Sequence, residues 1–220
     1  KIKGGFDLDQ DIRIVRAVRA ELGKDFIVMT DANQGYTVDV ALKAAEAFAD
    51  CGVFWLEEPL FVEDIAGHAE LREKGGVPIA VGENLNMCYA FENFVLRGAV
   101  DYLQPDVARA GGITEIKKIT AMAAKHGVPI SFHTWGDGVA LAASVHLSAA
   151  IKECIVMELD YTYNPLREEL LREPLAVQNG CLVPFDKPGL GVELNLDALH
   201  RFAFSGTEEI ALRQNTLRGV

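Results

Sequence analysis

The stretch Val53-Phe54-Trp55-Leu56-Glu57 is a short apolar run that ends in a carboxylate, and this pattern recurs along the chain. Residues 26–31 end in Asp31 and residues 77–83 end in Glu83, each of them 26 residues from Glu57. The series continues at similar intervals with Asp106, His133 and Glu158. This spacing is typical of a strand followed by a helix. We expect several parallel strands to carry a functional side chain at their carboxyl ends, where βα-barrels build their active sites.

Between the apolar runs, helical periodicity and glycine stops predict helices. The predicted helices span residues 9–22, 37–50, 62–74, 87–97, 112–126 and 138–150, and a further one spans 165–173. The last of the main six, 138–150, is apolar almost all round, which predicts a buried helix. Strict alternation of strand and helix with short connections predicts a parallel sheet.

The fold class predicted is therefore α/β, a TIM-type (β/α)7β barrel. Six strands end in functional groups, and Lys1-Ile2-Lys3 resembles the tail of one more. A closed barrel needs eight strands, so we expect the first strand and most of the second to be missing. Residues 1–160 are expected to hold the barrel units from strand 2 to strand 8. Residues 161–220 are expected to form a helix and a tail that return toward an absent N-terminal capping domain.

Three carboxylates at neighbouring strand ends repel one another unless a cation lies between them. Asp31, Glu57 and Glu83 offer hard oxygen ligands, which suit Mg²⁺. Lys1 and Lys3 are two residues apart on a strand end, so both side chains point to the same face and can meet these carboxylates. Asp106 and His133 end neighbouring strands, within expected hydrogen-bonding reach. A carboxylate behind an imidazole fixes its tautomer and raises its basicity.

These residues carry a resemblance to a known family. Lys1-x-Lys3, Asp31-Ala-Asn33, Trp55-Leu-Glu57-Glu58-Pro59, Gly82-Glu83-Asn84, Gln104-Pro105-Asp106 and His133 resemble the enolase superfamily, and within it the mandelate racemase subgroup. The segments His133-Thr134-Trp135-Gly136 and Met157-Glu158-Leu159-Asp160 are similar to those of galactarate cycloisomerase-type members. The resemblance extends from Lys1 to about residue 199.

The resemblance implies a role for each matching residue. Mg²⁺ is expected on Asp31, Glu57 and Glu83, with Lys3 as one acid/base and Lys1 near the substrate carboxylate. The dyad of His133 and Asp106 is expected to act on the opposite face, while Glu158 hydrogen-bonds an enolate oxygen. Substrate contacts are expected from Asn33 and Trp135. The superfamily abstracts a proton next to a carboxylate and stabilises the resulting ene-diolate with Mg²⁺.

Several reactions are compatible with this set. The first is isomerisation of a hydroxy acid or sugar acid by a racemase, epimerase or cycloisomerase. The second is dehydration of an acid sugar by the same residues. A muconate cycloisomerase-type reading is disfavoured, because that subgroup resembles the chain at Lys-x-Lys but places a Lys after its sixth strand, and residues 75–116 contain none. A non-catalytic barrel scaffold is the alternative from another class.

Composition limits the partners. The 220 residues carry a formal net charge of −11, which disfavours nucleic acid and anionic membranes as partners. No apolar run approaches the roughly 20 residues of a membrane span. The four cysteines show no CxxC spacing, as expected of reduced cysteines in a cytoplasmic protein. The expected partners are a small carboxylate substrate and further copies of the same chain in a homo-oligomer.

Overall fold

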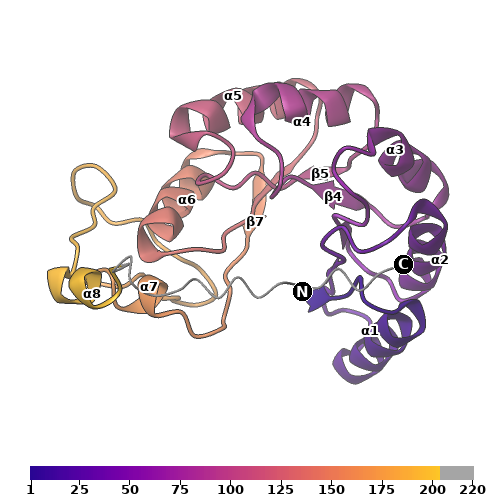
Figure 1. Ribbon diagram of the computed structural model, residues 1–220, viewed down its shortest axis with the longest axis horizontal. Coiled ribbons are helices and arrows are strands. Elements are labelled where there is room, and N and C mark those ends of the chain that lie inside the picture. Colours follow the sequence, from indigo (N-terminus) through magenta and orange to yellow (C-terminus); the bar gives the residue numbers. More distant parts are fainter. Residues whose placement is uncertain (204–220) are drawn as a thin grey trace.

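The computed structural model describes residues 1–203, and within them strands and helices alternate along the chain (Figure 1). The strands are β1 (Ile2–Lys3), β2 (Thr30–Asp31), β3 (Leu56–Glu57), β4 (Ile79–Val81), β5 (Tyr102–Leu103), β6 (Ile130–Phe132) and β7 (Cys154–Met157). The helices are α1 (Leu8–Leu22), α2 (Val38–Asp50), α3 (Ile65–Lys74), α4 (Met87–Leu96), α5 (Gly112–Lys125), α6 (Gly138–Ala150), α7 (Pro165–Glu168) and α8 (Leu196–Arg201).

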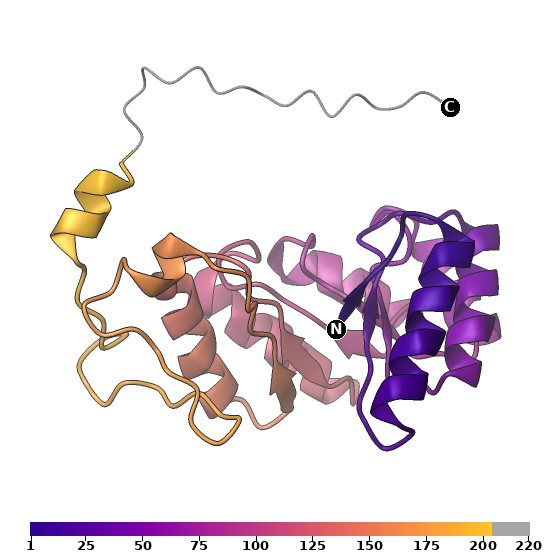
Figure 2. The ribbon, with the colours of Figure 1, turned by 90° about the horizontal axis from the view of Figure 1, so that it is seen from below.

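The strands form one parallel sheet in which each strand pairs with its neighbour in the sequence, from β1 to β7. The sheet curls into an arc, and α1 to α6 follow its outer side (Figure 1). Figure 2 shows the same arc from below, with α1 at one end and α7 and α8 at the other. All strands therefore point their carboxyl ends to the same rim, which confirms the predicted arrangement.

The arc is an incomplete TIM-type barrel, as predicted. It has seven strands among the described residues, one fewer than a closed barrel. Within that part of the chain, β1 pairs only with β2 and β7 pairs only with β6. The two ends of the sheet consequently have free edges.

The core lies between the sheet and the helices that cover it. Its largest fully buried side chains include Phe48 on α2, Phe91 and Phe94 on α4, and Phe132 on β6. Each such side chain contributes about 1.5–3 kcal/mol when it leaves water. Helix α6 is buried over much of its length, which confirms the expectation from its apolar sequence.

Two helix boundaries differ from those predicted by more than one residue. Helix α3 begins at Ile65 instead of residue 62, because the Asp64 side chain accepts a hydrogen bond from Gly67 N and caps the helix there. Helix α7 ends at Glu168 instead of residue 173, because Leu171 then pairs with Leu194 in an isolated antiparallel bridge. The final part of the predicted tail, residues 204–220, lies outside the described residues.

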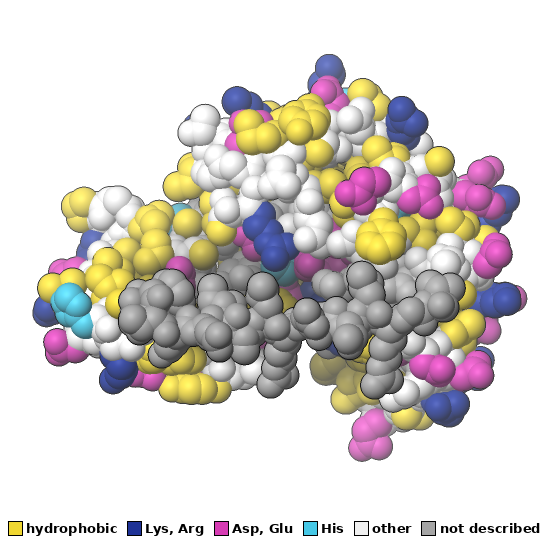
Figure 3. All heavy atoms as spheres, in the orientation of Figure 1, with side chains coloured by type: hydrophobic (Ala, Val, Ile, Leu, Met, Phe, Trp, Pro, Cys, Tyr) yellow, Lys and Arg dark blue, Asp and Glu magenta, His cyan; other side chains and the backbone are white. Residues whose placement is uncertain are grey.

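The surface carries charges of both signs. Acidic and basic side chains are interspersed over the region formed by α1 to α3 on the face shown in Figure 3. None of the helices described by the structure is long and apolar enough to cross a membrane.

Candidate active site

The register of the sheet brings Lys3, Asp31 and Glu57 together. Lys3 is paired with Asp31 across β1 and β2, and Asp31 is paired with Glu57 across β2 and β3. Each of the three is the last residue of its strand. Neighbouring strands lie about 4.8 Å apart, so their side chains meet at the rim.

Glu83 joins this group through a turn that requires glycine. Gly82 has φ 158°, and a Cβ at this position would lie 2.6 Å from the backbone of Gln104. The end of β4 can therefore lie against the segment after β5. One ligand atom from each of Asp31, Glu57 and Glu83 lies within 4.8 Å of the others, and all three residues are buried.

Two ammonium groups approach these carboxylates. Lys1 Nζ lies 2.5 Å from Glu57 Oε1, 3.3 Å from Asp31 Oδ2 and 2.7 Å from Glu158 Oε1. Lys3 Nζ lies 2.5 Å from Asp31 Oδ2. The lysine pair therefore meets the carboxylates from one side, as the spacing of Lys1 and Lys3 predicts.

Burial and charge shift the pKa values of Lys1 and Glu57. Burial by itself would lower the pKa of Lys1, but the charges of Glu57, Glu158 and Asp31 outweigh it and raise the pKa above its usual value. Burial raises the pKa of Glu57 to about 7; the charge of Asp31 adds to this rise and that of Lys1 opposes it. The site thus holds Lys1 in its protonated form. Next to it, Glu57 ionises less readily than an ordinary carboxyl group unless a further cation is present.

His133 and Asp106 form the predicted dyad. His133 Nδ1 lies 2.7 Å from Asp106 Oδ2, while Asp106 Oδ1 accepts a hydrogen bond from Ala108 N. His133 Nε2 lies 3.0 Å from Glu83 Oε2. Burial opposes the charged imidazolium, but the hydrogen bonds to Asp106 and Glu83 raise the pKa of His133 above its usual range. Burial would raise the pKa of Glu83, yet the contacts with His133 lower it.

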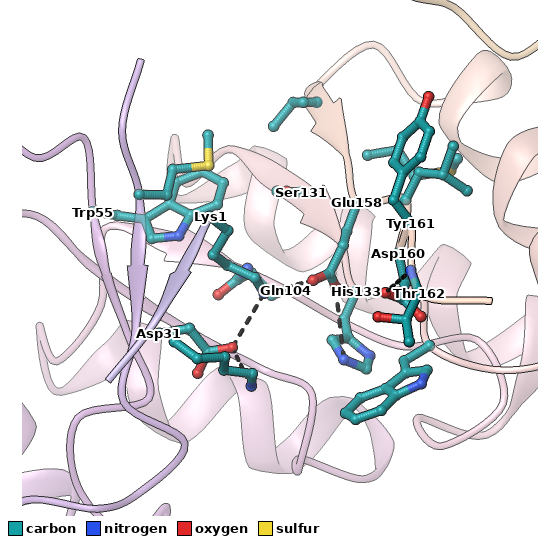
Figure 4. A pocket seen from close by; sticks show the side chains of 16 residues that line it. Lys1, Asp31, Trp55, Gln104, Ser131, His133, Glu158, Asp160, Tyr161 and Thr162 are labelled. Atoms are coloured by element: carbon teal, nitrogen blue, oxygen red, sulfur yellow. Dashed lines mark hydrogen bonds and ion pairs between the residues drawn. The ribbon is translucent and has the colours of Figure 1, made fainter. Parts of the chain in front are cut away.

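Glu158, the residue after β7, also belongs to this network of contacts. Its carboxylate contacts Lys1, lies 3.7 Å from His133 Nε2 and accepts a hydrogen bond from Thr134 N. Figure 4 shows Lys1, Glu158 and His133 directed into the same space from different parts of the arc. The structure thus places all the predicted metal-ligating and acid/base residues in one continuous network of contacts.

Neutral donors hold the oxygens that the cationic groups leave free. Glu57 Oε2 accepts hydrogen bonds from Gln104 Nε2 at 2.8 Å and from Trp55 Nε1 at 3.2 Å. Asp31 Oδ1 accepts one from Asn33 N at 2.9 Å. Sequence reasoning missed the roles of Gln104 and Trp55. Their positions, two residues before Asp106 and Glu57, are the signal that points to them, because residues two apart in an extended segment point to the same side.

The donor set fits a hard divalent cation. The three carboxylates are buried, converge within reach of a single ion, and each has one oxygen facing cationic groups while the other is held by neutral donors. Hard oxygen ligands of this kind suit Mg²⁺.

A cavity of about 590 Å³ opens beside the charged network. Its lining includes Lys1, Lys3 and His133 together with Trp135, whose side chain is 65% exposed. The Asn33 amide instead donates to Glu83 Oε1 at 3.1 Å. Of the two predicted substrate contacts, Trp135 thus faces the cavity, whereas Asn33 contacts a candidate metal ligand.

Comparison with known proteins agrees with this geometry. Residues 1–198 match the family model described as "Enolase C-terminal domain-like". The chain is 42% identical over 210 residues to D-galactarolactone cycloisomerase of Agrobacterium fabrum, covering 92% of this chain and 56% of the relative. It is 37% identical over 189 residues to L-talarate/galactarate dehydratase of Salmonella typhimurium, covering 86% and 45%.

A solved structure gives a similar result. L-talarate dehydratase from Polaromonas sp. JS666, complexed with Mg and L-glucarate, superposes with a TM-score of 0.78 at 34% identity. The match covers 90% of this chain and 53% of that protein. The chain thus spans about half the length of the relatives that it matches. The family resemblance predicted from the sequence is confirmed, and the chain belongs to the enolase superfamily, of which it carries the C-terminal barrel region.

Proposed function

We propose that the protein is a Mg²⁺-dependent enzyme that removes the proton next to the carboxylate of a hydroxy acid or sugar acid and then completes an isomerisation. The observation that carries this proposal is the network joining three buried carboxylates to two lysines and a His–Asp dyad. When bound, Mg²⁺ supplies positive charge against the negative charge that develops on the substrate carboxylate. Asp31, Glu57 and Glu83 would hold it.

The residues of the chain provide acids and bases on two sides. Lys3 comes from β1 and His133 follows β6, so they approach the carboxylates from different parts of the arc. In one direction Lys3 removes the α-proton and His133 returns a proton to the other face, and the reverse reaction exchanges these roles. Asp106 holds the imidazole in place through Nδ1.

Two other groups would act on the substrate oxygens. The Lys1 ammonium is directed at the substrate carboxylate and stabilises the charge that builds up there. Glu158 would hydrogen-bond the same oxygens of the enolate, since it lies 2.7 Å from Lys1 Nζ and beside His133. Trp135 would form an apolar wall of the cavity, and Asn33 would contact the substrate from beside Glu83.

A cycloisomerase and a dehydratase differ only in the bond that breaks after the α-proton has left. In the first, a ring C–O bond opens and its oxygen takes a proton. In the second, a β-hydroxyl takes a proton and leaves as water. The similarity to a cycloisomerase and to an acid-sugar dehydratase supports both, and the higher identity with the cycloisomerase favours isomerisation.

The deciding experiment is incubation of the complete natural protein with Mg²⁺ in D₂O and a panel of sugar acids, sugar-acid lactones and small hydroxy acids, followed by NMR. Deuterium at the α-position of the recovered acid identifies a racemase or epimerase, and opening of a lactone or other cyclic sugar acid to a 2-keto-3-deoxy acid without loss of water identifies a cycloisomerase; one of these two results is expected. Formation of a 2-keto-3-deoxy acid from an open-chain sugar acid, with loss of water, identifies a dehydratase. Absence of both exchange and turnover across the panel contradicts the proposed activity and favours a non-catalytic scaffold.

The remaining features of the whole protein are inferences of the same kind. A segment beyond the described arc would supply the eighth strand and a capping domain, with residues 161–220 running toward that cap. The substrate would be a small carboxylate, and the acidic net charge disfavours nucleic acid and membrane surfaces. A cytoplasmic location agrees with the four free cysteines, and a homo-oligomer is inferred from the family resemblance alone.

A further inference from the structure

Glu58 is a buried carboxylate with no part in the proposed reaction. It is 0% exposed, and no lysine, arginine or histidine of the described residues lies within ion-pair distance of it. A carboxylate buried without a cationic partner costs free energy unless hydrogen bonds compensate. Its neighbour Glu57 belongs to the group of three converging carboxylates, whereas Glu58 does not.

The backbone fixes the direction of the Glu58 side chain. Glu58 has φ 34°, in the left-handed region that residues other than glycine seldom adopt. Its N–H donates to Ala80 O at 2.9 Å, and its carbonyl oxygen accepts from Gln34 N at 2.6 Å. These bonds hold the turn after β3 against β4 and direct the carboxylate toward the segment that follows β4.

Asn84 connects Glu58 to a candidate metal ligand. Its Nδ2 donates both to Glu58 Oε2 at 2.6 Å and to Glu83 Oε1 at 3.1 Å. Its backbone N–H donates to Glu58 Oε1 at 3.2 Å. On the other side, Asn84 Oδ1 accepts from Arg109 Nη1 at 2.8 Å. The amide therefore has one possible orientation, because its NH₂ group faces two carboxylates and its oxygen faces a guanidinium.

This arrangement determines the orientation of Glu83. Its Oε1 is held by Asn84 and Asn33, so Oε2 is the oxygen that faces His133 and the other carboxylates. Arg109 also donates to the Glu83 carbonyl oxygen at 3.3 Å. A change in Glu58 or Arg109 consequently reaches Glu83 without touching the cavity.

We infer that Glu58 and Arg109 are positioning residues that act through Asn84 to hold Glu83 for cation binding. Glu58 holds the amide from the inside of the barrel wall and Arg109 from the outside. This inference rests on the proposed Mg²⁺ site at Asp31, Glu57 and Glu83.

The test is the dissociation constant of Mg²⁺ alone, measured by titration calorimetry on the complete metal-free protein without substrate. In Glu58→Gln the side chain keeps its size but has only one acceptor oxygen for the donors that surround it. The expected result is an increase of about tenfold in the dissociation constant, the lower end of the effect of residues that orient metal ligands. Thermal unfolding of the metal-free variant shows whether it is folded.

Glu115→Gln is the matched control. Glu115 is also a buried carboxylate, and it accepts a hydrogen bond from Cys88 N, but its partner is Lys118 on α5. Its Mg²⁺ affinity is expected to equal that of the wild type. If Glu115→Gln weakens Mg²⁺ binding as much as Glu58→Gln does, the effect comes from general loosening of the fold and the inference is wrong.

Arg109→Gln provides a test that does not depend on a buried position, because Arg109 is exposed. A smaller increase in the dissociation constant than in Glu58→Gln is expected, since Asn84 keeps its two carboxylate partners. Wild-type affinity in folded Arg109→Gln and Glu58→Gln would overturn the inference and leave the metal site intact. Failure of the wild-type protein to bind Mg²⁺ would instead overturn the proposed function.

Discussion

Gln104 meets Glu57 at the oxygen that no cationic group contacts. In Gln104→Leu this buried acceptor loses its closer donor and keeps only Trp55 Nε1. We expect the Mg²⁺ dissociation constant to rise about tenfold, because the freed carboxylate loses its fixed orientation. The free energy of unfolding should fall by about 1–3 kcal/mol, the cost of a buried polar group without its partner. Calorimetric titration and urea unfolding measure the two effects.

Thr120→Val is the control for this variant, because the buried Thr120 hydroxyl on α5 donates a hydrogen bond to Lys117 O and contacts no carboxylate. It should leave Mg²⁺ affinity unchanged. Equal affinity in Gln104→Leu and the wild type would show that Trp55 alone is sufficient to hold Glu57.

Lys3 is the group expected to exchange a proton on one face of the substrate. Lys3→Ala should abolish that exchange, whereas Mg²⁺ affinity should not fall, because the ammonium lies on Asp31 Oδ2 and opposes a bound cation there. NMR in D₂O reports the exchange and calorimetry reports the affinity. Lys118→Ala, on the surface of α5, is the control. Near wild-type turnover by Lys3→Ala would contradict its role as a base.

At the scale of single residues, the sequence predicts position better than orientation. Apolar runs place Asp31, Glu57 and Glu83 at strand ends, because the period of a strand and the start of the next helix are local properties. The Asn84 bridge was not predictable in this way. It depends on the positive φ of Glu58 and on how the loops after β3 and β4 turn beyond their strands. The residues that meet there are at least 24 positions apart in the chain.

At the scale of elements, α3 and α4 pack through a buried histidine. His68 on α3 lies edge-on to Phe94 on α4, with ring centroids 5.2 Å apart. His68 Nδ1 lies 2.8 Å from Asp64 O, and Nε2 has no partner among the described residues. Burial lowers the pKa of His68, because the imidazolium would lose its hydration.

This packing predicts a pH dependence of stability. The unfolded chain binds a proton at His68 once the pH falls below about 6.5, while the folded chain resists it. The contribution of neutral His68 is therefore complete above that pH and is lost as the pH falls toward the lowered folded-state value. In His68→Phe this loss should disappear, at a cost of about 1 kcal/mol at pH 7.5 for the missing hydrogen bond. Urea unfolding at pH 7.5 and 5.5 measures both, and an identical pH dependence in the two proteins would contradict the assignment.

The elements themselves were predicted well where a glycine stop and apolar periodicity agree, as in α2 and α5, and also in α6, which is apolar almost all round. The predictions were wrong where a side chain decides the boundary. The Asp64 cap shortens α3 at its start. Beyond α7, pairing of Leu171 with Leu194 replaces helix, and a contact between residues so far apart in the chain leaves no local pattern to detect.

At the scale of the whole molecule, the arc exposes apolar groups near its free edges. On β7, Ile155 is 49% exposed and Val156 41%, and at the other end Phe26 and Ile27 are exposed before β2. Unpaired strand edges with apolar side chains are sites of association. Residues 1–220 expressed alone should therefore self-associate and bind a hydrophobic dye. A longer natural chain that supplies the eighth strand should bind little dye and form one oligomer of defined size.

Light scattering during size-exclusion chromatography and dye fluorescence compare the two proteins. A monodisperse monomer of residues 1–220 with little dye binding would show that the arc is complete without a further strand. The sequence predicted an incomplete barrel from its count of strands, but not which apolar side chains stay exposed near the edges, since that depends on packing between distant segments.

The order of strands in the arc has a consequence for engineering. The carboxylates proposed to hold the cation come from β2, β3 and the segment after β4, whereas Trp135 and Glu158 follow β6 and β7. Because sheet order equals chain order, these two groups occupy separate, uninterrupted stretches of the polypeptide. A single crossover near residue 110 would exchange the part of the cavity wall that comes from residues 131–162 with that of a relative and preserve the cation ligands. New substrate preferences can in this way be recombined as whole cassettes rather than built one mutation at a time.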